Sequence, residues 1–185
     1  MVDYFCCDKK KVLNEVVKIN KNSFHVCEGY DQTVEYPREI QKEYDVSFIG
    51  NLYGHRRELI DRVASPVKVI SNAFGPEHSI NVGKSKINLN FCTDFGASDR
   101  VYKIMAAGGF LLSDDWEGRV ENFVDNEHLV IYRGIEELNE KISYFLNNSE
   151  ERQEIARKGL QGVKKFDRIS WAKNIIDLSH AVAGK

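Results

Sequence analysis

Arginine and amide side chains stand close to glycine residues after several apolar runs of this sequence. The first such segment, FIGNLYGHRREL, has Gly50 and Asn51 at the end of an apolar run, with Arg56 and Arg57 shortly after it. The arginine guanidinium is a planar fork of donors that fits the oxygens of a phosphate. Positive charge at the start of a helix is unfavourable beside the helix dipole. We therefore weigh an anion site here equally against an ordinary solvated helix start.

A second segment, ISNAFGPEH, offers a surface for a planar ring. Asn72 and Phe74 lie in it, and Pro76 is interpreted as a stop. A flat aromatic ligand could stack on Phe74 or pair with the backbone near it. Asn, Gly and Pro are, however, the usual residues of turns, and this simpler interpretation is favoured.

The third segment, NFCTDFGASDRVYKIM, joins a loop of small residues to the start of a predicted helix. Gly96 keeps the loop small, and Ser98 or Asp99 is predicted to cap the helix that contains Arg100 and Lys103. The first N–H groups of a helix, together with its dipole, make its amino end a ready site for anions. We expect this helix start to face the same crevice as the arginines of the first segment.

The same helix runs into Gly108-Gly109, a pair that is predicted to end it with one glycine at positive φ. A short apolar strand follows and ends on Asp114-Asp115. We expect these two carboxylates at the functional edge of the sheet.

The sequence contains no pattern typical of a nucleophile with its base. It has no GxSxG, no Walker loop and no GxGxxG after a strand, which argues against α/β-hydrolases, P-loop enzymes and dinucleotide dehydrogenases. The five histidines are scattered without an i, i+4 pair, so no metal site is expected. No catalytic residue is assigned, and any chemistry would be positioning and charge stabilisation around a diphosphate.

The composition excludes several classes of partner and location. The formal net charge of the 185 residues is −2, which gives no field that would gather nucleic acid or an anionic membrane. No run approaches the ~20 apolar residues of a spanning helix, and the first residues lack the order of a secretory signal. The four cysteines form no CxxC pair and are interpreted as reduced thiols. A cytoplasmic location is predicted.

Apolar runs suited to strands alternate with helical patterns along the chain, which predicts an α/β fold: a Rossmann-like, mainly parallel sheet with helices on both faces. The predicted strands are 2–5, 23–27, 45–50, 67–71, 87–91, 109–113 and 128–132. Predicted helices, besides the one that starts near Ser98, are 10–19, 55–64, 136–148, one from Ser149, and about 169–183.

One boundary is visible in the sequence. Residues 1–37 are interpreted as a single βαβ unit followed by a linker, and residues 38–185 as a Rossmann-like unit complete in itself. The last helix carries a stripe of Trp171, Ile175 and Leu178 that needs a covering surface. We expect it to pack on residues 1–30 or in a dimer contact.

Four segments resemble the carboxyl-terminal half of group 1 glycosyltransferases of the GT-B type, and they occur in the same order as in that family. They are YDVSFIGNLYGHRREL, SKINLNF, DRVYKIMAAGGFLLSDD and NEHLVIYRGIEELNEKISYFLNNSEERQEIARKG. The sequence is most similar to the spore-maturation-type branch of that family. By this resemblance, residues 1–37 hold a remnant of an amino-terminal domain, and residues 38–185 form a nucleotide-sugar-binding domain.

The resemblance implies a nucleotide-diphosphate sugar as donor and transfer of its sugar to an unidentified glycan, lipid or protein. The diphosphate would lie against the loop Gly50–Arg57 and the helix start Ser98–Arg100, and the base near the turn that holds Asn72 and Phe74. Arg56 and the helix dipole would stabilise the leaving diphosphate, and neither a metal nor another cofactor is implied.

Two departures from the family pattern leave alternatives open. Lys103 stands where the family usually has a glutamate that accepts hydrogen bonds from the ribose, and an ammonium group cannot accept. Either Lys103 meets a phosphate, or donor binding is altered or lost. Only a remnant of the acceptor half is expected, so an amino-terminal domain or a dimer partner would complete the enzyme. The alternatives are a non-catalytic module of this fold that has lost nucleotide-sugar binding, and a Rossmann-like protein for another phosphorylated ligand.

Overall fold

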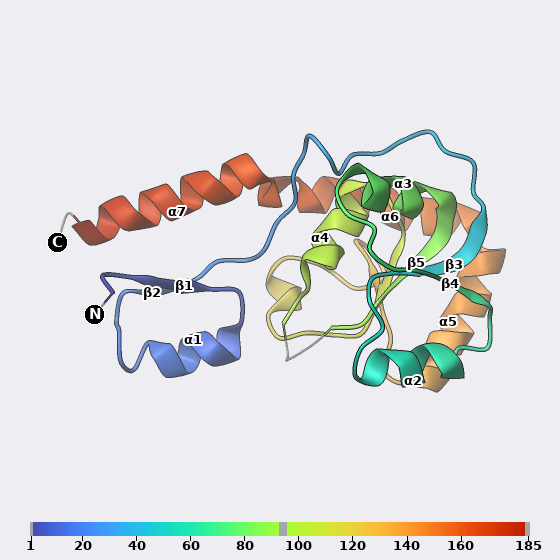
Figure 1. Ribbon diagram of the computed structural model, residues 1–185, viewed down its shortest axis with the longest axis horizontal. Coiled ribbons are helices and arrows are strands. Elements are labelled where there is room, and N and C mark those ends of the chain that lie inside the picture. The colour runs from blue at the N-terminus through green and yellow to red at the C-terminus, as the bar shows by residue number, and fades with distance from the viewer. Residues whose placement is uncertain (1, 93–95, 184–185) are drawn as a thin grey trace.

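The computed structural model describes residues 2–92 and 96–183, apart from the side chain of Ala183, and has the expected α/β fold (Figure 1). The strands are β1 (Phe5–Cys7), β2 (Ser23–His25), β3 (Tyr44–Ile49), β4 (Val67–Ile70), β5 (Ser85–Asn90), β6 (Leu111–Ser113) and β7 (Val130–Ile131). The helices are α1 (Lys10–Val16), α2 (His55–Arg62), α3 (Pro76–Lys84), α4 (Asp99–Ala106), α5 (Ile135–Asn147), α6 (Ser149–Val163) and α7 (Arg168–Ala183), with 3₁₀ turns at Arg119–Glu121 and Lys164–Phe166.

Five strands form one parallel sheet in the order β4-β3-β5-β6-β7. The chain moves from β3 outward to β4, crosses back past β3 to β5, and then continues through β6 to β7. The direction of winding therefore reverses between β3 and β5, and the loops that follow these two strands diverge. In open parallel sheets, ligands bind in the crevice at this switch point.

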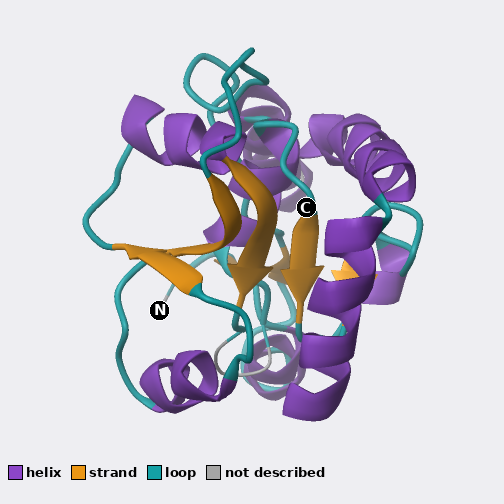
Figure 2. Ribbon diagram, turned by 90° about the vertical axis from the view of Figure 1, so that its right-hand side faces the viewer, coloured by secondary structure: helices purple, strands orange, loops and turns teal. Residues whose placement is uncertain are grey.

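Helices cover both faces of this sheet, so its strands are apolar on both sides, as the nearly continuous apolar runs predict (Figure 2). One face packs against α3, α4 and α6, and its core includes Ile49, Leu111 and Ile131 from the strands with Val82, Ile104, Met105 and Val163 from the helices. The other face packs against α2 and α5, and its core includes Phe48, Leu89 and Leu112 with Leu59, Leu138 and Ile142.

The amino-terminal residues form a second, smaller sheet in which β1 and β2 pair in parallel, with α1 between them in sequence. Helix α7 extends from the main body and lies alongside this unit (Figure 1). The start of α7 is joined to the segment that follows β2, since the Tyr30 N–H donates to the Phe166 carbonyl at 3.2 Å and Tyr30 forms a bridge with Asp167.

The stripe of the last helix faces the amino-terminal unit, as one of the two expectations had it. Ile175 and Leu178 are half-buried. Trp171 lines a cavity with Cys27 and neighbouring residues of the unit and remains 43% exposed. The helix is therefore covered only in part within this chain.

The proline of the second polar segment begins a helix. Pro76 is the first residue of α3, and Gly75 precedes it with φ +55°. Proline is well suited to the first helical position, because the N–H it lacks has no partner there. The interpretation of Pro76 as a stop was wrong. The Gly108-Gly109 pair, by contrast, follows α4 as predicted, with Gly108 at φ +73°.

Candidate functional site

A cleft of about 210 Å³ lies at the switch point of the main sheet. Its walls come from the three loops after β3, β4 and β5 and from the helices that follow them. The lining residues are Ile49, Gly50, Asn51, Tyr53, Arg56, Ala73, Phe74, His78, Asp99, Arg100 and Lys103. Seven of the eleven residues expected at a binding site from the sequence thus line one cleft.

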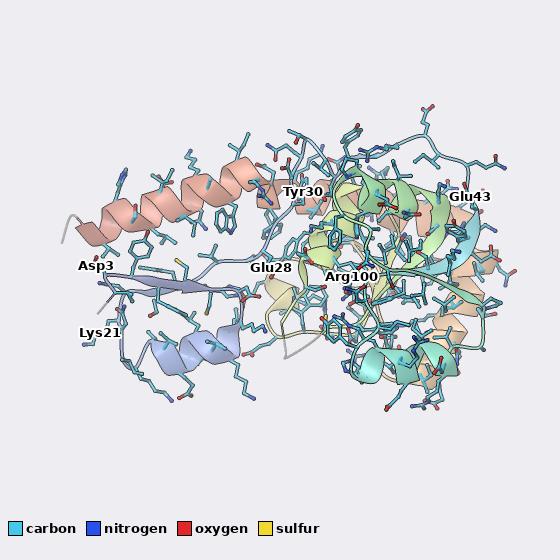
Figure 3. All side chains as sticks on the ribbon, viewed as in Figure 1. Asp3, Lys21, Glu28, Tyr30, Glu43 and Arg100 are labelled. Carbon is cyan, nitrogen blue, oxygen red and sulfur yellow. The ribbon has the colours of Figure 1, made fainter. Side chains whose placement is uncertain are left out.

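Arg100 is anchored in this cleft by the ends of two strands. Its Nε donates to the Ile49 carbonyl at 2.8 Å, and its Nη1 donates to Asn90 Oδ1 at 2.8 Å. Gly50 allows this approach, because a Cβ at Gly50 would lie 2.8 Å from Arg100 Nη2. Figure 3 shows Arg100 deep in the main body. The side chain is 9% exposed.

Arg56 also turns inward from the start of α2 and is 2% exposed. Its guanidinium lies 4.2 Å from the centre of the Tyr53 ring, a cation–π distance. Two carbonyls accept long hydrogen bonds from it, Asn51 at 3.3 Å and Phe91 at 3.5 Å. Its Nε is buried without a partner.

The two guanidinium groups give the cleft a net positive charge, because Asp99, the one carboxylate among the described residues that line it, forms its ion pair with Lys103. Neither Arg56 nor Arg100 forms an ion pair with a carboxylate in the part of the chain that the structure describes. Burial, together with repulsion from Arg56, lowers the pKa of Arg100 from its ordinary value. Buried charge without a counter-charge is costly, so this arrangement favours an anion in the cleft.

The start of α4 is arranged by a strand residue that the sequence reading did not single out. Ser98 is the N-cap, but its hydroxyl donates to Asn90 Oδ1 at 2.9 Å and makes no capping hydrogen bond. Ser98 is thus the N-cap residue, as one of the two predictions had it, but its side chain does not cap the helix. Asn90 Nδ2 donates in turn to the Ser113 hydroxyl at 2.9 Å. Asn90 thus fixes both Arg100 and the helix start, and its only sequence signal is an amide within an apolar strand.

His78 is a second residue of the cleft that the sequence reading missed. It lies in α3 and is 7% exposed, and its Nδ1 is buried without a partner. Burial, with further contributions from Lys103 and Arg100, lowers the pKa of His78 to about 4. The ring is therefore neutral at pH 7, and one of its nitrogens can accept a hydrogen bond.

Lys103 lies one turn into α4 and forms an ion pair with Asp99, four residues earlier. Both residues line the cleft, as expected. The ammonium group is thus already paired, although the pair is partly exposed and weak by its nature.

The remaining expected residues lie outside the lining of the cleft or at its rim. Phe74 lines it but is 75% exposed, so its ring is open to solvent. Arg57 and Asn72 are exposed and do not line it, and Asn72 has φ +59° in the turn before α3. Gly96 is buried against the Lys9 side chain.

The two carboxylates after β6 accept hydrogen bonds from other residues of the protein. The Asp114 carboxylate accepts the Cys92 N–H at 2.7 Å, and the Asp115 carboxylate accepts from Arg119 Nε at 2.7 Å. Neither lines the cleft. These two carboxylates therefore stabilise the loop after β6 and do not contribute to the cleft.

The described residues contain neither a cluster of metal ligands nor a membrane-spanning helix. No group of three or more His, Cys, Asp or Glu side chains is arranged to hold a metal within residues 2–92 and 96–183. Over the same residues, no helix has the length and apolar character needed to cross a bilayer. All four cysteines are free thiols.

Several solved structures have this fold. HepE of Anabaena, crystallised with UDP and glucose, matches with a TM-score of 0.80 and 11% identity over 98% of this chain and 64% of its own. TarM of S. aureus, in a complex that includes UDP, matches with a TM-score of 0.73 and 11% identity over 96% of this chain and 44% of its own. The carboxyl-terminal domain of LpcC, a group 1 glycosyl transferase of Francisella tularensis, matches with a TM-score of 0.60 and 16% identity over 76% of this chain and 100% of its own.

These likenesses show a GT-B type fold, and the chain spans less than two thirds of the length of the first of these structures. A comparison with curated protein sequences finds no significant match. Residues 35–177, well over half of the sequence, match the family described as glycosyl transferase-like. The chain belongs to that glycosyl transferase-like family.

Proposed function

We propose that this chain is the donor-binding part of a glycosyltransferase that transfers a sugar from a nucleotide-diphosphate sugar to an acceptor. The observation that carries the proposal is the pair of buried guanidinium groups, Arg56 and Arg100, that line one cleft and form no ion pair with a carboxylate among the described residues. A diphosphate supplies the negative charge and the acceptor oxygens that these groups lack.

In this proposal the diphosphate lies between Arg56 and Arg100 at the amino end of α4. The base lies toward the loop after β4, where Phe74 offers a ring face at the rim. His78 is then close to the nucleoside, and its partnerless Nδ1 is suited to a ribose or base hydrogen bond. HepE and TarM, which share the fold, were crystallised with UDP.

The chemistry that follows is charge stabilisation. When the bond from the sugar to the diphosphate breaks, negative charge builds on the leaving diphosphate. Arg56, Arg100 and the dipole of α4 are fixed donors aimed at that charge, so they need little reorganisation during the reaction. No metal is needed for this role.

The finer assignments belong to the same proposal. The sequence segments favour the spore-maturation-type branch of these enzymes and a cytoplasmic location. The acceptor is a glycan, lipid or protein. Because the first matching structures are longer than this chain, catalysis is proposed to need a further domain, in the same protein or in a partner.

A second candidate is a non-catalytic module that keeps the fold and has lost donor binding. It is favoured by Lys103, which is paired with Asp99 and cannot accept hydrogen bonds from a ribose. The two candidates differ in whether a nucleoside diphosphate binds the cleft at all.

Thermal denaturation with UDP, GDP and ADP, and with their sugar conjugates, distinguishes these candidates. A ligand at a hundred times its dissociation constant stabilises a protein by about 2.7 kcal/mol. We expect one nucleoside diphosphate to raise the melting temperature of the wild-type chain and to raise that of Arg56→Ala by half as much or less. No increase with any of them at millimolar concentration would favour the non-catalytic module.

A further inference from the structure

A second cavity, of about 270 Å³, adjoins the cleft at the first turns of α4. It is lined by Glu28, Gly29, Tyr30, Asp99, Lys103, Arg168 and Trp171. These residues come from the segment after β2, from α4 and from the start of α7. The two cavities share Asp99 and Lys103 as a common wall. Figure 3 shows Glu28 and Tyr30 between the amino-terminal unit and the body that holds Arg100.

Glu28 is the polar group of this cavity that lacks a partner. Its Oε2 is buried and accepts no hydrogen bond. Burial, together with repulsion from Asp99 and Asp8, raises the pKa of Glu28 from its ordinary value to about 7. A buried carboxylate oxygen without a donor costs free energy, which a ligand with a hydroxyl or amine donor would recover.

The charges of the cavity restrict the class of that ligand. Glu28 and Asp99 oppose an anion, and Lys103 and Arg168 oppose a cation. A neutral ligand that both donates and accepts hydrogen bonds meets both pairs, which is the chemistry of sugar hydroxyls. Trp171 and Tyr30 add aromatic side chains to the wall, and such rings present an apolar surface with a polar edge.

The size of the cavity fits a small ligand. Sites for drug-sized ligands span roughly 300–1,000 Å³, and this cavity lies just below that range. One sugar ring is therefore the fitting unit, with any longer chain extending outside.

We propose that this second cavity is a saccharide site that holds the terminal sugar of the acceptor, with Glu28 accepting a hydrogen bond from one of its hydroxyls. Binding of a sugar ring follows from the cavity itself, and only its role as acceptor site rests on the proposed function. The shared wall of Asp99 and Lys103 places such a sugar beside the cleft at the amino end of α4.

Titration by NMR saturation transfer tests this proposal with neutral probes, the methyl glycosides of glucose, galactose, mannose and N-acetylglucosamine. Each is added to about 10 mM, so that dissociation constants near 1 mM are measured. We expect at least one glycoside to bind the wild-type chain. Glu28→Gln and Trp171→Ala should each weaken that binding at least fivefold. The matched changes Glu140→Gln and Ile176→Ala, at exposed positions outside the cavity, should leave it unchanged.

The pH dependence gives a second readout that a merely structural effect would not produce. A hydroxyl that donates to the carboxylate favours its ionised form, so affinity is full above pH 7 and falls up to tenfold by pH 6. Glu28→Gln should remove this dependence. The groups that face Glu28 and whose titration must be compared are Asp8, Lys9, Tyr30, Asp99, Tyr102, Lys103 and Arg168.

Absence of binding by all four glycosides, or equal binding by wild type and Glu28→Gln, would overturn the saccharide site. Titration of the same samples with UDP, GDP and ADP separates this failure from that of the proposed function. If a nucleotide binds and no glycoside does, the inference fails alone. If a glycoside binds and no nucleotide does, the saccharide site stands and the donor site fails.

Discussion

The two cavities beside α4 differ in charge although they share a wall. The cleft at the switch point has three cationic side chains, Arg56, Arg100 and Lys103, against one carboxylate, that of Asp99. The second cavity has two cationic side chains against two carboxylates. The cleft also holds a neutral histidine with a partnerless nitrogen, and the second cavity a carboxylate with a partnerless oxygen. Charge balance therefore separates a site suited to a diphosphate from one suited to a neutral polyol.

The largest expected effect comes from removing the residue that organises the cleft. Asn90→Ala leaves Arg100 Nη1 and two hydroxyl groups without their buried partner. At about 1–3 kcal/mol for each buried group left unsatisfied, we expect the free energy of unfolding to fall by about 4 kcal/mol. Urea denaturation measures this loss. A loss below about 1 kcal/mol would mean that Asn90 does not position the cleft.

Acid should destabilise the protein through the cleft. Because the pKa of His78 is lowered to about 4 in the fold, the unfolded chain binds the proton first as pH falls from about 6.5. The stability that the neutral ring supports is present above pH 6.5 and is lost toward pH 4, by about 3 kcal/mol. Urea midpoints of wild type and His78→Gln at pH 7 and pH 4.5 measure it. Equal pH dependence in both proteins would contradict a buried neutral ring.

The substitution Lys103→Glu tests whether the lysine at this position weakens the binding of a nucleoside diphosphate. The carboxylate would accept from the ribose, and a hydrogen bond to a charged group contributes about 1.5–3 kcal/mol. We expect roughly ten- to a hundredfold tighter binding of the nucleoside diphosphate that shifts the melting temperature most, and a smaller gain for its 2′-deoxy form. Calorimetric titration of both ligands measures the difference. An equal gain for both would place the ribose elsewhere.

A rise in pH from about 4.5 to 7 should destabilise the protein through Glu28 of the second cavity, which is the smallest of these effects. Because the pKa of Glu28 is raised to about 7, the unfolded chain loses this proton first as pH rises from about 4.5. The stability that the protonated group supports is present at low pH and lost toward pH 7. Glu28 is half-buried, so solvent screening reduces the loss to about 1 kcal/mol. At pH 8, Glu28→Gln should therefore unfold at a higher urea concentration than wild type, and a lower one would contradict it.

Much of the fold could be predicted because its signals are local. The strands predicted at 45–50, 67–71 and 87–91 correspond to β3, β4 and β5, since continuous apolar runs bounded by polar turns are typical of strands buried on both faces. Helix α3 was missed because its start, Gly75-Pro76, is also an ordinary turn sequence. Only the packing of its buried face makes it a helix.

The sequence predicted which loops form the candidate site, but it did not predict which side chains of those loops contact one another. Gly50, Arg56 and Arg100 were found because they follow apolar strands that must end at one edge of a parallel sheet. Asn90 and His78 were missed because their surroundings form only when the strands and helices pack together, and no local pattern marks them. Arg57 was included with Arg56 because a sequence does not tell which of two adjacent arginines turns inward at a helix start.

Arg56, which is buried, and Arg57, which is exposed, allow the most direct test of the central claim. That claim is that buried guanidinium groups without an ion pair hold a diphosphate. Inorganic pyrophosphate, which has no base or sugar, is titrated by calorimetry into wild type, Arg56→Ala and Arg57→Ala. We expect wild type and Arg57→Ala to bind it alike and Arg56→Ala to bind at least tenfold more weakly, a difference of about 1.4 kcal/mol. Equal binding by the two variants, or none by the wild-type chain, would contradict the account.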